Sequence, residues 1–372
     1  MTGCTDNTNS VGNSLIGNNE KFTIADTTIG AVSDTVFNVS APNGSGAVNV
    51  VGRTSDVESK MWLRMSTGAV SDTLGLWAID TVELRLVVAY TWNPPSAPAE
   101  FEVREALSGW TQAGATRDSL SQMQIGSQVL GRITRQLNLH DTITVQLDTA
   151  AIRRMLTFSS ASGAAPFYGF VIVPKPGTTT GMVGFASAVN SLGGPAMTIR
   201  LSKNGTYVTM PVLTYGEDTF IATANRTTGP ELEVRGGVST WSKLKFDVSG
   251  LSPSLIINDA TLELTQKSEL LGAGTPDSLY AYLSRKGNAP SAIDSAYRIP
   301  GKRKSGTGTT DPVYEFRITP YVQFMIAQGS VYDGIVLHAP DNLQSVNHMV
   351  FYSSKDADVT KRPRVLITTS KK

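Results

Sequence analysis

Two histidines in the C-terminal part of the chain are placed to do metal chemistry. His338 and His348 are separated by a polar stretch that contains Asp341. If residues 334–338 and 348–352 pair as a hairpin, both imidazoles fall on the outer face of the sheet, with that carboxylate in the connecting loop. Such a set suits zinc or another transition metal. We favour the alternative, two solvent-facing histidines beside a polar loop, because neither a fourth ligand nor this register follows from the sequence.

Cations and aromatic residues gather in a loop-like stretch of the second half and form the best positive patch of the chain. Arginine pairs well with the carboxylates and sulfates of sugars, and aromatic faces stack on sugar rings. The members of this patch are Tyr282, Arg285, Lys286, Tyr297, Arg298, Lys302, Arg303 and Lys304. Trp92 is a separate candidate for sugar contact, expected to be exposed because Pro94 and Pro95 end its strand. The alternative to ligand binding is a solvated loop, which most charge runs form.

No acid–base constellation in the sequence predicts catalysis. The chain has three histidines, and no Gly-x-Ser-x-Gly nucleophile motif accompanies them. A glycosidase needs two carboxylates that flank a cleft, whereas Asp333 and Asp341 occur at turns, where Asp is common for backbone reasons. Gly306-Thr307-Gly308 lacks the strand-to-helix context of a phosphate-binding loop. We therefore expect a protein that is not an enzyme and that has no catalytic cofactor.

The composition limits the partners of the chain. In 372 residues, 32 Lys and Arg stand against 31 Asp and Glu, for a net charge of +1. Proteins that bind nucleic acid usually carry a basic excess, so we expect none here. No apolar run reaches the roughly 18 residues that a membrane-spanning helix needs. The 34 Gly, the 18 Pro and the 17% of charged residues favour a turn-rich β protein.

The N-terminal residues predict a surface location. The only cysteine is Cys4, and it follows Met1-Thr2-Gly3. Small residues before a cysteine resemble the end of a bacterial lipoprotein signal, although the apolar stretch that precedes such a site is not in the sequence. A lipid on Cys4 would anchor the chain to a membrane, and a free thiol on a polar tail is the alternative. Residues 1–30 are expected to be a flexible arm or tether of an extracellular or cell-surface protein.

The chain reads as a tandem repeat, because seven short segments recur in the same order. The matches are Asp34–Phe37 with Asp218–Phe220, Leu63–Met65 with Leu244–Phe246, Ile79–Leu86 with Ile257–Leu264, Val145–Leu147 with Phe316–Ile318, Gly169–Val173 with Gly334–His338, Phe185–Ser187 with Phe351–Ser353, and Pro195–Ile199 with Pro363–Ile367. They predict two domains of similar size, at 31–209 and 210–372.

Each repeat is predicted to be an antiparallel β-sandwich. Polar and apolar residues alternate in Thr81–Leu86, Thr142–Leu147 and Thr261–Leu264, which is typical of strands with one face on a core. Helical spacing occurs only in matching places, at 149–156 and 319–327, each beginning at a threonine. The predicted fold class is all-β, with two tandem jelly-roll sandwiches, one short helix in each, and an extended N-terminal arm.

The order of these motifs resembles the DNRLRE domain family. The second unit carries the resemblance best, in Lys243–Leu251, Ala260–Leu264, Phe351–Lys355 and Arg362–Val365. The first unit is similar but diverged, with Phe185-Ala186-Ser187 where the family has Phe-Tyr-Ser. The resemblance implies jelly-roll sandwiches of secreted or surface proteins, related to carbohydrate-binding modules, without catalytic residues. It also implies a structural calcium ion, for which turn carboxylates such as Asp34 and Asp218 could serve, although no diagnostic ligand spacing is present.

Two functions follow as competing hypotheses. The first is a non-catalytic surface protein that binds polysaccharide, with Arg285, Lys286, Arg298, Lys302 and Arg303 contacting anions while Tyr282 and Tyr297 stack. The second is a structural subunit of an extracellular fibre or surface layer. In that case the N-terminal arm adds a strand to the sheet edge of another copy.

Overall fold

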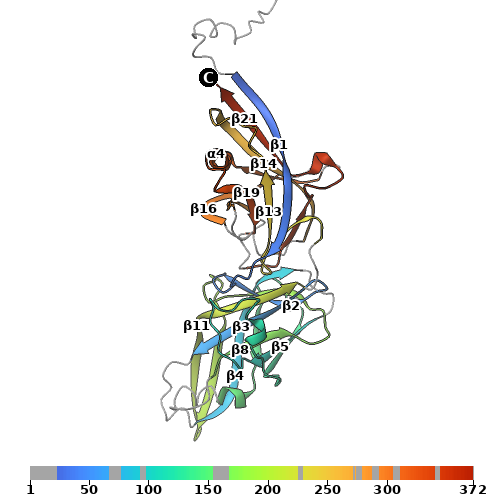
Figure 1. Cartoon of the computed structure of the whole chain (residues 1–372). Coiled ribbons are helices and arrows are strands. Elements are labelled where there is room, and N and C mark those ends of the chain that lie inside the picture. Colours follow the sequence, from blue (N-terminus) through green and yellow to red (C-terminus); the bar gives the residue numbers. More distant parts are fainter. Residues whose placement is uncertain are drawn as a thin grey trace, which may run out of the picture.

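The structure, a computed structural model, is all-β and contains two large antiparallel sheets of eleven and ten strands. It describes residues 23–66, 77–92, 98–153, 167–224, 229–270, 273, 279–286, 293–304, 311–339 and 344–371. Each sheet closes over its own core, and the two resulting lobes lie end to end (Figure 1). The predicted fold class, two tandem β-sandwiches, is confirmed.

We call the lobe formed mainly by residues 48–203 the N-terminal body. Its own strands are β2 (Val48–Arg53), β3 (Val57–Ser66), β4 (Ala78–Trp92), β5 (Ala99–Glu105), β6 (Gly131–Arg135), β7 (Thr142–Gln146), β8 (Phe170–Pro174), β9 (Gly181–Ala186) and β10 (Ala196–Lys203), with a short 3₁₀ helix, η2 (Leu120–Gln122). Alternation along β4 places Val82, Leu84 and Leu86 in the core at 0% exposure, as the period-two pattern predicts.

The C-terminal body, formed mainly by residues 232–371, repeats this order. Its strands are β12 (Leu232–Arg235), β13 (Thr240–Phe246), β14 (Ile256–Leu270), β15 (Tyr280–Arg285), β16 (Ile293–Pro300), β17 (Lys302–Lys304), β18 (Val313–Arg317), β19 (Tyr332–His338), β20 (His348–Phe351) and β21 (Arg364–Lys371), with helix α4 (Thr319–Ala327) and a 3₁₀ helix, η4 (Val359–Lys361). Helix α4 matches the predicted 319–327, and Pro320 occupies its first turn. In the N-terminal body, residues 149–153 are helical at the equivalent place.

The register confirms that the repeated sequence segments are structural equivalents. In the N-terminal body, Leu63 of β3 pairs with Phe170 of β8. In the C-terminal body, Leu244 of β13 pairs with Ile335 of β19. The matches read from the sequence align these same four residues. The two bodies therefore share one strand topology.

Two further strands, which we call the leader strands, complete the bodies. They are β1 (Thr23–Asn38) and β11 (Thr206–Ala224). The first half of β1 pairs with β21 and its second half pairs with β13. In the same way, the first half of β11 pairs with β10 and its second half pairs with β3. Between the halves the register shifts, at Ala31/Ser33 in β1 and at Thr214/Asp218 in β11, because the strand bends from one layer of the sandwich to the other.

The leader strands are exchanged between the repeats. β1 precedes the N-terminal body in the chain, yet it pairs with β21 and β13 of the C-terminal body. β11 precedes the C-terminal body, yet it pairs with β10 and β3 of the N-terminal body. Figure 1 shows β1, in blue, running along the lobe that is otherwise yellow to red. The predicted units, 31–209 and 210–372, instead grouped residues 31–38 of β1 with the N-terminal body and most of β11 with the C-terminal body. Residues 23–30, predicted to belong to a flexible arm, form the half of β1 that pairs with β21.

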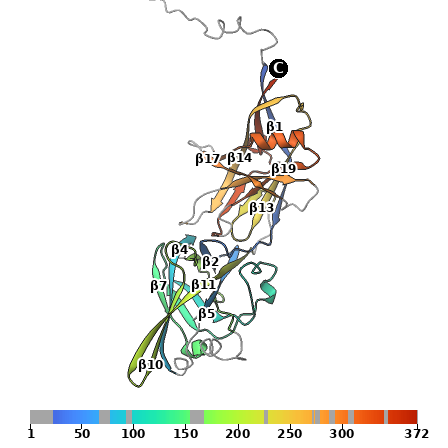
Figure 2. The same ribbon diagram turned by 90° about the vertical axis from the view of Figure 1, so that its left-hand side faces the viewer.

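The two bodies touch through a mixed apolar and polar contact. Tyr90 of β4 and Phe220 of β11 pack in one buried cluster with Val238 and Val346 of the C-terminal body. The Tyr90 hydroxyl donates to Oδ1 of Asn347 at 3.0 Å. The lobes are therefore joined by side chains as well as by the exchange of the two leader strands. Figure 2 shows both lobes from the side.

Candidate functional site

One part of the predicted cation–aromatic patch assembles on the outer face of the C-terminal body. Tyr282 of β15 and Arg298 of β16 are paired residues in adjacent strands. The Arg298 guanidinium lies 4.6 Å from the ring centre of Tyr280, which alternates with Tyr282 along β15. Tyr282 is only 8% exposed, and burial raises the pKa of its hydroxyl. This face therefore presents an exposed cation over the Tyr280 ring, with Tyr282 buried beside it, rather than an open aromatic platform.

Other cations of the predicted patch are paired with acidic residues. Arg285 Nη2 lies 3.1 Å from Oδ2 of Asp294. Burial acts to raise the pKa of Asp294, but hydrogen bonds from Arg285 and Tyr332 hold it below its ordinary value. Arg303 Nη2 lies 2.5 Å from Oε1 of Glu269. These ion pairs leave less positive charge for an external anion than the sequence suggests.

The remaining members of the patch are separated in space. Tyr297 packs its ring 4.8 Å from that of Phe324 on α4, so its face is occupied by the core. Lys302 and Arg303 lie on β17, which pairs with β18 rather than with the strands that carry Tyr282 and Arg298. Lys286 is exposed beside a different pocket, next to α4. The predicted single patch is thus divided among several surfaces.

Trp92 is not the exposed platform expected from its following prolines. Its side chain is 6% exposed and belongs to the apolar cluster that joins the two bodies. The expectation was wrong because this cluster also includes Val238 and Val346 of the other repeat, and the adjacent Thr91 pairs with Ala273 of that repeat. Sequence around Trp92 carries no sign of that contact.

The two histidines do not form the metal site that the sequence left open, and the favoured alternative of two solvent-facing histidines is also wrong, because His348 is 7% exposed and His338 is half-buried. β19 pairs with β13 and β15, whereas β20 pairs with β12 and β14, so His338 and His348 are not opposite each other in a hairpin. Asp341 lies outside the described residues. Within the described part of the chain, no group of three or more His, Cys, Asp or Glu side chains is arranged to hold a metal ion.

His348 sits in a buried charged cluster. Its Nδ1 lies 3.0 Å from Nη2 of Arg235, and its Nε2 lies 3.3 Å from Oε2 of Glu233. Burial acts to raise the pKa of Glu233, but hydrogen bonds from His348 and the Gly229 backbone hold it below its ordinary value. A guanidinium this close to the imidazole opposes cation binding. The cluster is built to neutralise buried charge.

His338 lies among aromatic rings. Its ring centre is 4.4 Å from that of Trp241 and 5.7 Å from that of Tyr282. Burial lowers the pKa of His338 to about 4. The imidazole is therefore neutral at physiological pH and serves as an aromatic packing residue.

The two aspartates considered for calcium accept hydrogen bonds that hold the leader strands. Asp34 of β1 accepts a hydrogen bond from the backbone N–H of Ser354, which follows β20. Asp218 of β11 accepts one from the backbone N–H of Ala188, which follows β9, at 2.8 Å. Asp218 is 2% exposed, and burial raises its pKa. Sequence analysis found the two aspartates as a repeated pair but missed this role.

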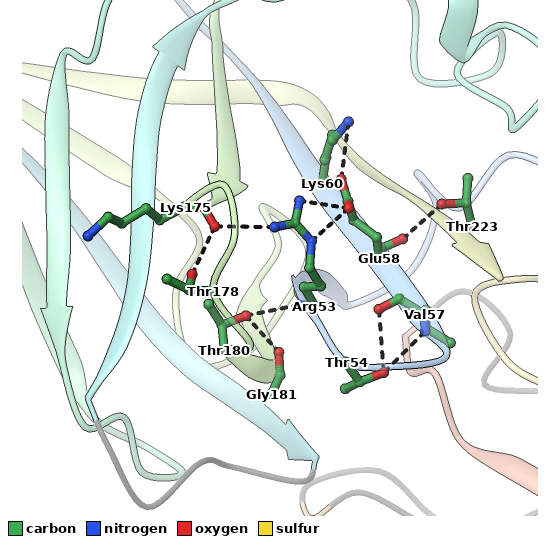
Figure 3. A network of polar contacts seen from close by, with 10 residues as sticks. All are labelled: Arg53, Thr54, Val57, Glu58, Lys60, Lys175, Thr178, Thr180, Gly181 and Thr223. Carbon is green, nitrogen blue, oxygen red and sulfur yellow. Dashed lines mark hydrogen bonds and ion pairs between the residues drawn. The ribbon is translucent and has the colours of Figure 1, made fainter. Parts of the chain in front are cut away.

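A polar network surrounds the β2–β3 turn of the N-terminal body (Figure 3). Arg53 forks onto one oxygen of Glu58, with Nε at 2.8 Å and Nη2 at 2.7 Å. Its Nη1 donates to the Lys175 carbonyl at 3.3 Å, and its backbone N–H donates to Thr180 Oγ1 at 2.9 Å. Thr223 of β11 donates to the Glu58 carbonyl at 3.3 Å. The network ties the end of β11 to the body and leaves no reactive group poised for chemistry among these residues.

A shallow pocket of about 450 Å³ lies beside Trp110 in the N-terminal body. The Arg64 guanidinium lies 5.2 Å from the Trp110 ring centre and is paired with Glu217. Trp110 donates its indole N–H to the Tyr168 carbonyl at 2.9 Å. The Arg64 charge and the Trp110 N–H, two of the polar groups that line this pocket, are therefore already engaged within the protein.

Neither a family model nor a curated protein matches the sequence of this chain. The resemblance to the DNRLRE family therefore stays a prediction drawn from motifs. None of the helices in the described residues is long and apolar enough to cross a membrane. Cys4, the predicted lipidation site, lies outside the described residues.

Proposed function

We propose that the protein is a non-catalytic structural subunit of an extracellular or cell-surface assembly, whose copies associate through the N-terminal strand. The observation that carries this proposal is the position of β1. Its residues 23–30 pair with β21, and no second strand among the described residues pairs with this half. An unpaired strand edge is a template for another strand.

The side chains on this half of β1 support the same function. Residues 23–28 are all exposed, and Ile24 is 69% exposed. A soluble monomer usually protects a strand edge with a lysine, a proline or a covering loop. Thr23–Gly30 contains neither a lysine nor a proline. Its Thr, Ile and Ala residues suit pairing with a second chain, and its one charged residue, Asp26, accepts a hydrogen bond from Thr368 Oγ1 at 2.8 Å.

The experiment is to follow assembly of the full chain by sedimentation velocity and negative-stain electron microscopy over a range of concentrations. We expect ordered multimers that are lost or much reduced in Ile24→Lys, because a charge on the strand edge opposes pairing. Val189→Lys is the matched control, since Val189 is similarly exposed, at 70%, but lies in a loop of the N-terminal body. Monomers at all concentrations, or equal loss in both variants, would overturn the proposal.

Polysaccharide binding is the second candidate, and the exposed Arg298 stacked on Tyr280 favours it. A guanidinium held over an aromatic ring is preorganised for a carboxylate or sulfate. We expect retardation in affinity gels that contain an acidic polysaccharide, and loss of most of it in Arg298→Glu. Lys203→Glu, an exposed cation at the far end of the N-terminal body, is the control. Equal mobility of all three proteins would rule this candidate out.

A further inference from the structure

We infer that β1 is exchanged between copies, so that the leader strand of one molecule occupies the C-terminal body of another. This inference rests on the proposed self-association and names its partner, a second copy of this chain, and its geometry. It differs from simple edge addition, in which every copy keeps its own β1.

β11 shows what a leader strand does when the next unit follows in the same chain. It completes the N-terminal body, which precedes it, and the chain then continues into the C-terminal body. In the C-terminal body the equivalent slot is filled by β1, a strand that precedes the N-terminal body in the chain rather than following the body it completes. β1 of a second copy, continuing into its own N-terminal body, would repeat the arrangement of β11. The bond to Ser354 shows that this slot accepts a leader strand in the same way as the slot of β11.

The two leaders are attached very differently. β11 is joined to β10 by the tight turn Asn204-Gly205, where φ is 51° and 76°. This hairpin forces β11 onto its own chain. β1 has no such link to its neighbour β21, because Asp26 and its partner Thr368 are 342 residues apart. The effective concentration that holds β1 in its own molecule is therefore lower than for a hairpin strand.

β1 is also held by less buried surface. None of its 16 residues is fully buried. In β11, Phe220, Ile221 and Ala222 are at most 3% exposed. The equivalent residues of β1 are Val36, Phe37 and Asn38, which pair with β13 as those three residues pair with β3. They are half-buried or exposed. Burial of apolar side chains is the main force that holds a strand in a sandwich, so β1 detaches more readily than β11.

An emptied slot does not stay empty. Ile29 and Ala31 of β1 pack against the C-terminal core, and β1 pairs with the edges of both β21 and β13. Removal of β1 exposes this apolar surface and two strand edges at once. Only a strand of matching pattern and register satisfies both, and β1 of another copy is identical in sequence.

The test traps the strand in its acceptor with a disulfide between paired residues. Asp26 and Thr368 are opposite each other, with Thr368 Oγ1 donating to Asp26 Oδ1 at 2.8 Å. Differently tagged copies carry Cys4→Ser and either Asp26→Cys or Thr368→Cys, and are mixed, allowed to assemble and oxidised. A covalent heterodimer forms only if β1 of one copy lies on β21 of the other. The matched control is Thr209→Cys mixed with Arg200→Cys, a pair in the β10–β11 hairpin that stays within one chain.

We expect a heterodimer in the assembled fraction of the Asp26/Thr368 mixture and none in the control mixture. A second variant carries both Asp26→Cys and Thr368→Cys in one chain, oxidised at low concentration to lock β1 in place. We expect this locked chain to remain monomeric until it is reduced. Assemblies without heterodimer, or assembly of the locked chain at the wild-type level, would overturn exchange while leaving the proposed function intact. No assembly at all in the wild type would overturn both.

Discussion

Asp34 and Asp218 occupy equivalent positions in opposite bodies. Asp34 faces Leu244 of the C-terminal body, and Asp218 faces Leu63 of the N-terminal body. Asp34 accepts a hydrogen bond from the backbone N–H of Ser354, which follows β20. Asp218 accepts one from the backbone N–H of Ala188, which follows β9, the equivalent strand. Each aspartate thus fastens a leader strand to the repeat that is not its own.

The two aspartates are expected to respond differently to substitution. Asp34→Ala removes a charge-assisted hydrogen bond at a half-buried site and should lower the free energy of unfolding of the C-terminal body by about 1–3 kcal/mol. Asp218→Asn keeps an acceptor for Ala188 and removes a carboxyl whose pKa burial raises. A raised pKa means that ionisation of Asp218 lowers the stability of the folded state as the pH rises. The uncharged amide of Asp218→Asn avoids this loss, so the substitution should be neutral or stabilising at pH 8. Urea denaturation at pH 8 measures both, and a large loss for Asp218→Asn would contradict this account.

His338 should make stability depend on pH between about 6.5 and 4. Its folded pKa of about 4 lies below the ordinary value of 6.5, so the unfolded chain takes up a proton in this window and the folded chain does not. The contribution is complete above pH 6.5 and is lost as the pH falls towards 4. The loss amounts to about 3 kcal/mol, at about 1.4 kcal/mol per pKa unit.

His338→Phe keeps a ring beside Trp241 but cannot titrate. We expect its unfolding free energy to fall less than that of the wild type between pH 7 and pH 4.5. Guanidinium denaturation at both pH values gives the comparison. Parallel losses in the two proteins would show that other groups govern the acid sensitivity.

Gly169 and Gly334 are a matched pair of positions that exclude any side chain. A Cβ would lie 2.1 Å from the Leu63 carbonyl oxygen at Gly169, and 2.1 Å from the Leu244 carbonyl oxygen at Gly334. Gly169 also has φ of 101°. We expect Gly169→Ala and Gly334→Ala each to cost about 2–3 kcal/mol in its own body, by forcing two strands apart. Gly30→Ala, with nothing within 4 Å, should cost less than 1 kcal/mol in the same thermal melts.

Phe220 should couple the stability of the two bodies. It is fully buried on β11 and packs in the same cluster as Val238 and Val346 of the C-terminal body. Phe220→Ala should cost about 3–5 kcal/mol and increase hydrogen exchange in both bodies. Leu201→Ala, at an equally buried position inside the N-terminal core, is the control and should affect the N-terminal body alone. If hydrogen exchange increases in only one body in both variants, the contact between the bodies at Phe220 transmits little stability.

Local patterns in the sequence predicted the elements and their equivalence well. The alternation of Val82, Leu84 and Leu86 predicted a half-buried strand. The repeated segments predicted that Leu63 is equivalent to Leu244 and Phe170 to Ile335, and the pairing of Leu63 with Phe170 and of Leu244 with Ile335 agrees with that equivalence. Such features depend on residues a few positions apart or on one sheet, so periodicity reveals them.

The destination of the leader strands could not be predicted in the same way. The two bodies offer equivalent slots, and Asp34 fits either by pattern. The burial of Trp92 and the separation of His338 from His348 were missed for a related reason. Both depend on which distant strand lies alongside, and a jelly-roll topology places sequence neighbours such as β19 and β20 beside different partners.

The path of β1 has a consequence for synthesis of the protein on the ribosome. β1 is made long before its partner β21, because Asp26 and Thr368 are 342 positions apart in the chain. At roughly 5–20 residues per second, β1 waits for roughly 20–70 seconds before its slot exists. β11 meets β10 as soon as the hairpin emerges. Translation speed and local chain density therefore influence whether a nascent β1 closes on its own molecule or finds the finished C-terminal body of a neighbour.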